Sequence, residues 1–379
     1  MAGGVITSVA PVKQGPEVWL APGLVDLQVN GYGGHDGNSG SAGPQDIAAM
    51  VEALWRRGTT TLCPTIITGP AERMTESLHA VARARAEDAL VAHSVPCAHV
   101  EGPAISSEDG PRGAHPLEHV RGPDLGELDR WQEASGDLVG IVTLAPERPG
   151  AFAYISELNR RGIVAAIGHT AATPAQVRQA ADAGARLSTH LGNGSHAQLP
   201  RLDNYLWEQL ADDRLWASFI FDGHHLPPAA MRAMVRAKGM RRSLLVSDSV
   251  ALAGSPPGLY RAPVGGTVRL HPDGKLVMEG TGFLAGSASD LLTGVANAVR
   301  LVGLGPADAL SLASTNPAQL LGLGGPGGRG RLTVGHRADV AVLSWPPGAP
   351  APTPVATVVA GRLVHADPRN EEVAQACEP

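Results

Sequence analysis

Eight short apolar runs recur along the chain, and segments with helical spacing of apolar residues separate most of them. Alternating strands and helices favour a parallel sheet with helical crossovers. Eight such strand-and-helix alternations predict an α/β fold, a (β/α)8 barrel, with a doubly wound open sheet as the alternative. Asn30–Gly34 lacks the glycine spacing of a dinucleotide-binding turn. The eight runs are Leu24–Asn30, Thr60–Ile67, Ala98–Glu101, Leu138–Leu144, Ile163–His169, Leu187–His190, Ala217–Asp222 and Ser243–Asp248.

Two consecutive runs each end in a histidine, His169 and His190. Between them, Thr173 is expected to cap a helix that starts at Pro174 and stops at Gly184. A short crossover helix makes the flanking strands parallel neighbours, so both histidines should emerge at the same carboxyl edge of the sheet. Two imidazoles there are a candidate metal site, although either histidine alone could be a hydrogen-bonded core residue.

Barrels of this type carry their chemistry at the carboxyl ends of the strands. Glu101, His169 and His190 supply a carboxylate and two imidazoles, which suit one catalytic Zn²⁺, and other divalent ions are compatible. Such an ion lowers the pKa of a bound water to about 7, and Asp248 is the natural acceptor of its proton. Glu101 could instead pair with an arginine, and Asp248 could cap a helix. Further polar residues at strand ends are Gln28, Asn30, Thr65, His99 and residues 222–225.

The two ends of the chain have β character. We expect residues 1–20 and 331–367 to form a small β domain, and residues 21–330 to form the barrel. A hairpin with Asp273 and Gly274 at its turn is predicted over Thr267–Met278, after the eighth strand.

Composition excludes some classes of partner. The formal net charge of −6 over 379 residues argues against nucleic acid, and no apolar stretch approaches a membrane span. The start of the chain does not look like a signal peptide. Cys63, Cys97 and Cys377 form neither a disulfide framework nor a zinc-thiolate pattern. A cytoplasmic protein is therefore expected.

Several motifs in series resemble the N-acetylglucosamine-6-phosphate deacetylase family of the amidohydrolase superfamily. They occur in that family's order and cover nearly the whole predicted barrel. The resemblance implies a metal-dependent hydrolase that removes an acetyl group from an N-acetyl amino-sugar phosphate and acts as a homodimer. The motifs are Ala21–Gly34, His99–Pro103, Thr143–Glu147, Gly168–Thr173, Thr189–Asn193, Phe221–His225, Leu245–Asp248, Leu284–Ser287 and Thr315–Ala318.

The resemblance also implies roles for single residues. Asp248 would be the general base that later protonates the departing amine, and His115 would help to polarise the acetyl carbonyl. Arg201 would bind phosphate through its planar donor fork, and such a contact can cross the subunit interface in this family. Without the resemblance, His115 has no assignable role and Arg201 is an ordinary surface residue. The remaining residues expected to contact the substrate are Ala114, Asn193, Gly194, His225, Leu284, Ala285 and Gly286.

The chain departs from the family pattern in places. Many amidohydrolases place His-x-His at the end of the first strand for a second metal, whereas this chain has Gln28 and Asn30. Amides are poor zinc ligands, so one ion per chain is expected. Residues 194–196, residues 202–205 and His224 also differ, so the identity of the substrate is less certain to follow from the resemblance than the chemistry is. Alternative functions are an amidohydrolase for another N-acyl amine or a cyclic amide, and a sugar-phosphate binding protein without catalysis.

Overall fold

The computed structural model describes residues 1, 3–10, 18–262, 266–280 and 284–369. Eight parallel strands pair in the order β2-β5-β6-β7-β8-β9-β10-β11. The barrel is nearly closed between its first and last strands, where Asp248 N donates to Gln28 O at 3.0 Å. The predicted barrel is confirmed and the open sheet is excluded. The strands are β2 Leu24–Val29, β5 Thr59–Ile67, β6 Ala98–Glu101, β7 Val139–Leu144, β8 Val164–Ile167, β9 Leu187–Ser188, β10 Trp216–Ile220 and β11 Ser243–Val246.

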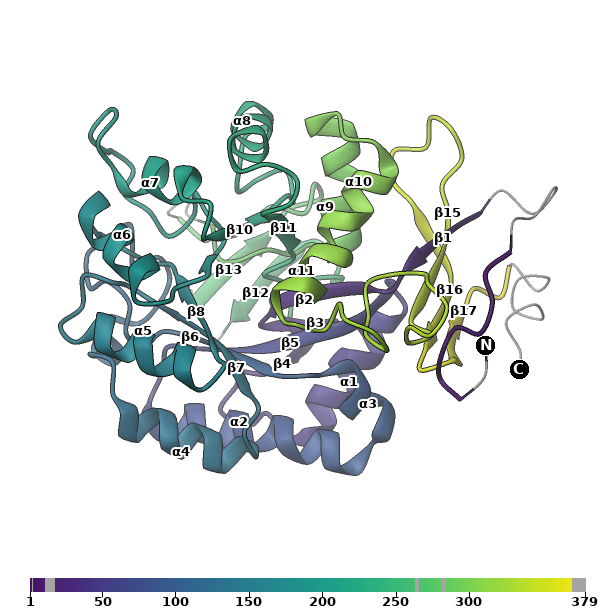
Figure 1. Ribbon diagram of the computed structural model, residues 1–379, viewed down its shortest axis with the longest axis horizontal. Helices are drawn as coiled ribbons and strands as arrows, with labels where there is room; N and C mark the ends of the chain where they lie inside the picture. The colour runs from purple at the N-terminus through teal and green to yellow at the C-terminus, as the bar shows by residue number, and fades with distance from the viewer. Residues whose placement is uncertain (2, 11–17, 263–265, 281–283, 370–379) are drawn as a thin grey trace.

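Helices surround the barrel (Figure 1). The predicted helix between the two histidine strands begins as expected, because Thr173 Oγ1 accepts from Gln176 N and Gln176 Oε1 accepts from Thr173 N. None of the helices in the described ranges is long and apolar enough to cross a membrane. The helices that follow the first seven barrel strands are α1 Pro44–Trp55, α2 Ala71–Glu87, α3 Ala89–Ser94, α4 Leu125–Ser135, α5 Ala151–Arg160, α6 Pro174–Asp182, α7 Tyr205–Ala211 and α8 Pro228–Lys238.

In the described residues after β11 there are four more helical segments. Asn316 ties them to the barrel, because its Nδ2 donates to Met240 O and Ser243 O at 2.7 Å each, just before and at the start of β11. This accounts for the Asn in the Thr315–Ala318 motif. The segments are α9 Leu291–Asn297, the π-helical turn η2 Ala298–Val302, α10 Pro306–Leu312 and α11 Thr315–Leu320.

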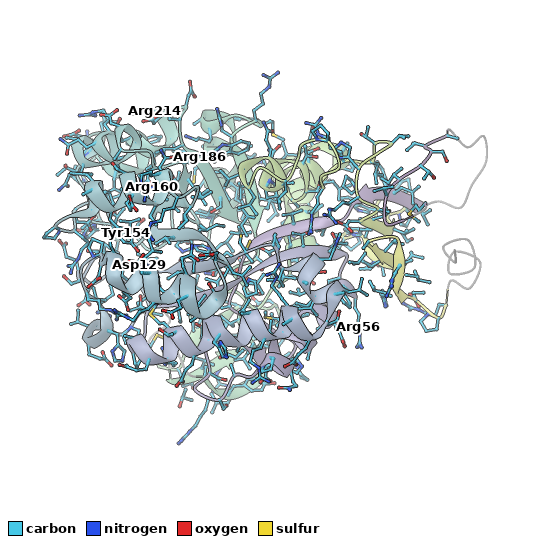
Figure 2. All side chains as sticks on the ribbon, turned by 60° about the horizontal axis from the view of Figure 1, so that its bottom comes forward. Arg56, Asp129, Tyr154, Arg160, Arg186 and Arg214 are labelled. Atoms are coloured by element: carbon cyan, nitrogen blue, oxygen red, sulfur yellow. The ribbon has the colours of Figure 1, made fainter. Side chains whose placement is uncertain are left out.

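The core lies inside the barrel and between its strands and the helical layer. Trp131 and Phe219 are among the largest fully buried side chains. Charged side chains such as Arg160, on α5, and Arg214, in the turn after α7, lie on the outer surface of the molecule (Figure 2). Arg214 pairs there with Asp182 at 2.5 Å. Exposed pairs of this kind contribute little stability, so burial of apolar strand and helix faces carries the fold.

Both ends of the chain contribute to a separate antiparallel sheet of order β1-β15-β16-β17, at the right of Figure 1. This confirms the small β unit built from both termini. A buried contact connects it to the barrel side, since His93 Nε2 lies 2.8 Å from Asp339 Oδ1. The domain boundaries at residues 20 and 331 stay a prediction, and residues 11–17 lie outside the described ranges. The strands are β1 Val18–Pro22, β15 Val340–Ser344, β16 Thr353–Val359 and β17 Arg362–Ala366.

A third sheet follows β11 and consists of β12 Gly258–Ala262, β13 Gly266–Leu270 and β14 Leu276–Met278. All its pairings are antiparallel. The predicted hairpin corresponds to β13 and β14, whereas β12 was not predicted. We call these three strands the flap, because they supply part of one wall of the cavity described below. A two-stranded ribbon, β3 Gly31–Tyr32 and β4 His35–Asp36, follows β2.

Candidate active site

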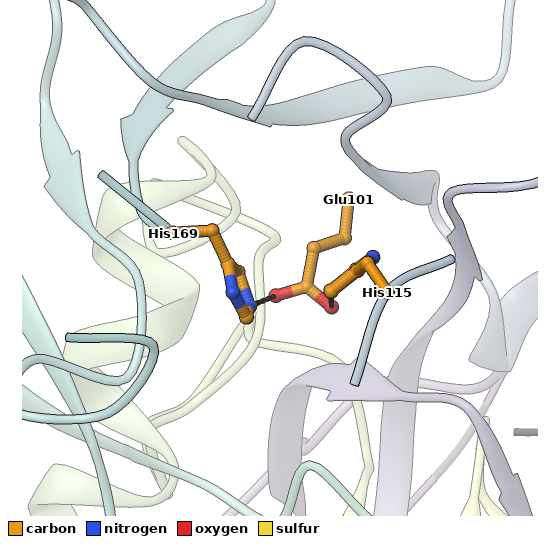
Figure 3. A group of neighbouring side chains, drawn as sticks. All are labelled: Glu101, His115 and His169. Carbon is orange, nitrogen blue, oxygen red and sulfur yellow. Dashed lines mark ion pairs between the residues drawn. The ribbon is translucent and has the colours of Figure 1, made fainter. Parts of the chain in front are cut away.

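Three histidines surround one buried carboxylate at the carboxyl ends of the strands. Glu101, the last residue of β6, has its Oε1 atom 3.3 Å from His169 Nε2 and 3.0 Å from His190 Nε2. His115, from the loop after β6, points at the same carboxylate, with Nε2 3.8 Å from Oε2 (Figure 3). All four side chains are buried. The structure therefore brings together the predicted ligands and adds His115 to them.

The ring orientations fit a metal centre. His169 Nδ1 lies 2.8 Å from Pro111 O and donates to it, because a carbonyl oxygen only accepts, so Nε2 is the ring atom that faces Glu101 and could bind a cation. The Nδ1 atoms of His115 and His190 are buried and have no hydrogen-bond partner among the residues that the structure describes. Neighbouring ligands of a tetrahedral Zn²⁺ lie about 3.3 Å apart, given bond lengths of about 2.0–2.1 Å. The contacts of His169 and His190 with Glu101 match that spacing.

Two overlapping ligand sets share Glu101 and His169. The sequence predicts His190 as the third ligand, whereas in the described part of the chain Glu101, His115 and His169 form the group whose ligand atoms all lie within 4.8 Å of one another. His190 approaches the same carboxylate oxygen as His169 does. We keep all four as candidates, and the assignment of Glu101, His169 and His190 as the metal ligands stays a prediction.

The charges of the cluster are set by burial and contact. Burial works to raise the pKa of Glu101, but hydrogen bonds from His169 and His190 hold that pKa well below its usual range. Burial, with the charge of neighbouring His169, lowers the pKa of His115 to about 3. Glu101 is therefore ionised and His115 neutral at pH 7, which are the forms that bind a cation.

Asp248 follows β11 and faces the cavity. Burial, followed by the negative charge of Glu101, raises the pKa of Asp248 to about 6. Its Oδ1 atom accepts a hydrogen bond from Asn30 Nδ2 at 2.8 Å. Gln28 lies near the same carboxyl end of β2 as Asn30, and its Nε2 donates to Glu101 Oε1 at 2.8 Å. The two amides in the usual His-x-His positions thus each hold one carboxylate of the site.

The site residues adopt unusual backbone conformations. His169, His190 and Asp248 have φ of 50°, 29° and 48°. Left-handed conformations of non-glycine residues cost on the order of 1–3 kcal/mol each and persist where the surroundings enforce them. The loop after His169 is held by Glu147, whose two carboxylate oxygens accept from Thr170 Oγ1 and Ala171 N. Glu147 lies in a motif quoted above without a role.

The backbone conformation and the close surroundings of Gly194 favour glycine at this position. It has a φ of 56°, and a Cβ there would lie 2.7 Å from His169 Nδ1. Any larger residue would displace the histidine. The backbone of the loop after His190 therefore packs directly on a candidate ligand.

His99 is not part of the cluster. Its Nδ1 contacts Leu27 O at 3.0 Å and its Nε2 contacts Thr143 Oγ1 at 2.7 Å. Burial lowers its pKa to about 4, so it is a neutral core histidine. Its position at a strand end, next to residues that do face the site, made it a candidate in the sequence.

A cavity of about 570 Å³ opens above the cluster. It is lined by all the residues predicted to act in catalysis or on the metal, and by each predicted substrate contact except Arg201. Arg201 is exposed on the loop before α7, and among the described residues its hydrogen-bond partner is Trp207, whose Nε1 donates to the carbonyl oxygen of Arg201. Lining residues that the sequence did not single out include Asp36, Asp46 and Arg261.

Fold and site together define a barrel enzyme with a candidate metal centre at the carboxyl ends of its strands. A profile of the Amidohydrolase family matches residues 19–364. The chain is 34% identical to an N-acetylgalactosamine-6-phosphate deacetylase of Escherichia coli O157:H7 over 347 residues, covering 90% of this chain and 89% of that protein. It is 32% identical to an N-acetylglucosamine-6-phosphate deacetylase of Bacillus subtilis (strain 168) over 330 residues, or 86% and 80% of the two chains.

The crystal structure of N-acetyl-D-glucosamine-6-phosphate deacetylase from Mycobacterium smegmatis is also similar. It superposes with a TM-score of 0.84 at 32% identity, covering 96% of this chain and 94% of that one. The chain belongs to the amidohydrolase family. The predicted resemblance and the predicted hydrolase class are thereby confirmed.

Proposed function

We propose that the protein hydrolyses the acetyl amide of an N-acetyl amino-sugar 6-phosphate, with N-acetylglucosamine 6-phosphate as the leading substrate. The observation that supports this most is the arrangement of Asp248 beside the Glu101 cluster at the floor of one cavity. Relatives that match most of the chain carry the names of such deacetylases. Products are acetate and the free amino-sugar phosphate.

The Glu101 cluster would bind the metal ion and activate the acetyl carbonyl. Glu101, His169 and His190 would hold one divalent ion, with His115 beside them. When bound, the ion would polarise the acetyl carbonyl and lower the pKa of a water molecule. His115, neutral because of its low pKa, would donate a hydrogen bond to the carbonyl oxygen as negative charge develops there.

Asp248 moves the proton. As a carboxylate it accepts a proton from the attacking water, whose oxygen forms a bond to the acetyl carbon. It then gives the proton to the amide nitrogen as the C–N bond breaks, so the amine leaves uncharged. A pKa of about 6 suits both steps near neutral pH, because the group is ionised at the start yet remains a competent acid.

A specific observation favours a second sugar. The first of the relatives given above, at 34% identity and 90% coverage, is named for N-acetylgalactosamine 6-phosphate. The two sugars differ in the orientation of one hydroxyl group. Asn193 and Gly194 line the cavity on the loop that departs from the family pattern, so that loop is the place where this choice would be made.

We further propose Zn²⁺ as the ion, one per chain, in a cytoplasmic homodimer. The N, N, O donor set supports zinc. Gln28 and Asn30 already hydrogen-bond the two carboxylates, which supports a single ion. The free thiols of Cys63 and Cys97, with sulfur atoms 3.5 Å apart, suit a reducing compartment. Metal analysis that found two tightly bound ions per chain would contradict the single-ion proposal.

The test is acetate release from a panel of substrates by the zinc-loaded protein. The panel contains the 6-phosphates of N-acetylglucosamine and N-acetylgalactosamine, both unphosphorylated sugars, a simple N-acyl amine and a cyclic amide. We expect the highest kcat/KM for one of the two phosphates. Preference for the simple amine or the cyclic amide would favour another amidohydrolase reaction, and binding of a sugar phosphate without turnover would indicate a binding protein.

A further inference from the structure

Two free thiols lie side by side on neighbouring barrel strands. The sulfur atoms of Cys63, on β5, and Cys97, directly before β6, are 3.5 Å apart, and neither residue lines the cavity. Thr65 and His99 are paired on these parallel strands, so the same register places the two cysteines opposite each other, two residues earlier. Neighbouring strands lie about 4.7–4.9 Å apart, which is within the Cα separation of about 4.4–6.8 Å that a disulfide spans.

The two thiols differ in accessibility. Cys63 is fully buried, whereas Cys97 is partly exposed at the start of its strand. The hydrogen bond with Cys97, followed by burial, raises the pKa of Cys63 well above its usual range. Cys63 therefore keeps its proton at pH 7 and can donate it in a hydrogen bond to the sulfur of Cys97. A reagent that arrives from solvent meets Cys97 first.

Two arginines place positive charge near the thiols. Arg329 is buried, and its Nη1 atom donates to Thr61 Oγ1, two residues before the buried thiol, at 2.8 Å. Asp339, at 4.0 Å, offsets part of that charge. Arg85, on α2, has a buried Nε atom with no hydrogen-bond partner among the described residues, and its charge acts on Cys97. Positive charge beside a partly exposed thiol favours the thiolate, which is the nucleophilic form.

We propose that Cys63 and Cys97 form a redox-active dithiol, which a peroxide oxidises to a reversible disulfide between β5 and β6. The Cys97 thiolate attacks one oxygen of the peroxide, the O–O bond breaks, and Cys97 becomes a sulfenic acid as hydroxide leaves. The sulfur of Cys63 then attacks Cys97 Sγ, and an S–S bond forms as the S–O bond breaks. Hydrogen peroxide is thereby reduced to two water molecules, whose added protons come from the two thiols.

The disulfide would link two strands without reaching the active site. The segment between the cysteines contains α2 and α3, so the bond would close a covalent loop around these helices. Cys97 precedes β6 and Glu101 ends it, so the bond would form at the opposite end of this strand from the candidate metal centre. The dithiol is therefore separate from the proposed hydrolysis, and its test measures thiols and not acetate.

The test treats the folded protein with hydrogen peroxide and measures the intact mass after alkylation of the remaining thiols. All proteins carry Cys377→Ser, so that the pair supplies the only thiols of the chain. We expect the treated parent protein to lose two hydrogen atoms and take up no alkyl group, and dithiothreitol to restore both thiols. Cys97→Ser should leave Cys63 unoxidised, and Cys63→Ser should leave Cys97 as a sulfenic or more highly oxidised acid.

Two further variants test the role of charge. Arg85→Met should slow the oxidation about 3- to 10-fold, because it removes a positive charge that favours the thiolate. Arg83→Met is the matched control, since Arg83 lies on the same helix but is exposed and pairs with Glu87 at 3.0 Å; it should react at the parent rate. Equal rates in these two variants would contradict activation by Arg85.

Three results would overturn the proposal as a whole. Both thiols could stay open to alkylation after peroxide treatment, or the disulfide could join two chains and not two strands of one chain. In the third, Cys63 of the Cys97→Ser variant would be oxidised as fast as the pair in the parent protein. That last result would show that the buried thiol reacts without its neighbour.

Discussion

Replacing Gln28 by leucine should weaken metal binding without unfolding the barrel. Gln28 is fully buried, and its Nε2 atom donates to Glu101 Oε1 at 2.8 Å. A hydrogen bond to a charged group contributes about 1.5–3 kcal/mol net. At 1.36 kcal/mol per decade this corresponds to a factor of about 10–150, and loss of a group that orients a ligand typically costs 10- to 100-fold in metal affinity. We therefore expect the Kd for Zn²⁺ to rise about 10- to 100-fold.

The assay is competition for Zn²⁺ against a chromophoric chelator at constant pH. Gln209→Leu is the matched control, because Gln209 is also a buried glutamine but its Nε2 donates to Tyr205 O, within α7. It should lower stability and leave the Kd unchanged. An unchanged Kd in Gln28→Leu, or a tighter one, would refute the idea that Gln28 orients Glu101 for a cation.

The remaining predictions concern pH, stability and metal. Activity should fall as the pH drops through about 6, because Asp248 acts as a carboxylate and its pKa is about 6. A bound cation favours the charged carboxylate and would move this midpoint to a lower pH. A midpoint above pH 7 in the profile of kcat/KM would contradict this prediction. Asp339→Ala should destabilise by about 2–4 kcal/mol in urea unfolding, because it removes the contacts with His93 Nε2 and Ala360 N. Burial works to raise the pKa of Asp339, but those contacts hold it below its usual 3.8, so their stabilisation is complete above that pH and is lost as the pH falls further; a wild-type pH profile of stability in the variant would argue against the contact. Zn²⁺ at a hundredfold excess over its Kd should stabilise by about 2.7 kcal/mol, and thermal unfolding of Glu101→Gln should show a clearly smaller shift.

Much of the barrel could be predicted because parallel strands are buried on both faces and appear as nearly continuous apolar runs. The pair His169 and His190 followed from one local unit, a short helix between two such runs. The strand β9, which spans only Leu187–Ser188, could also be predicted, because its short apolar run lies between two segments with helical spacing. The strand β12 escaped detection because its five residues alternate between exposed and partly buried positions and present no apolar run.

Contacts between distant loops could not be read from the sequence. His115 lies beside Glu101 because the loop after β6 folds back over the barrel, and no periodicity records that path. The donors Gln28 and Asn30 were recognised as replacements for metal ligands, but their hydrogen bonds with Glu101 and Asp248 depend on how the barrel closes. Arg201 and Arg261 are both exposed arginines, and only the fold shows that Arg261 lines the cavity whereas Arg201 does not.

The most direct test of the central claim is acetate release from N-acetylglucosamine 6-phosphate by wild type and Asp248→Asn, each loaded with Zn²⁺ to the same measured content. General acid–base catalysis typically contributes 10²- to 10⁴-fold. We predict that the wild type turns over the substrate and that Asp248→Asn loses about that factor in kcat while still binding metal and substrate. Equal kcat values in the two proteins, at equal metal content, would contradict the account.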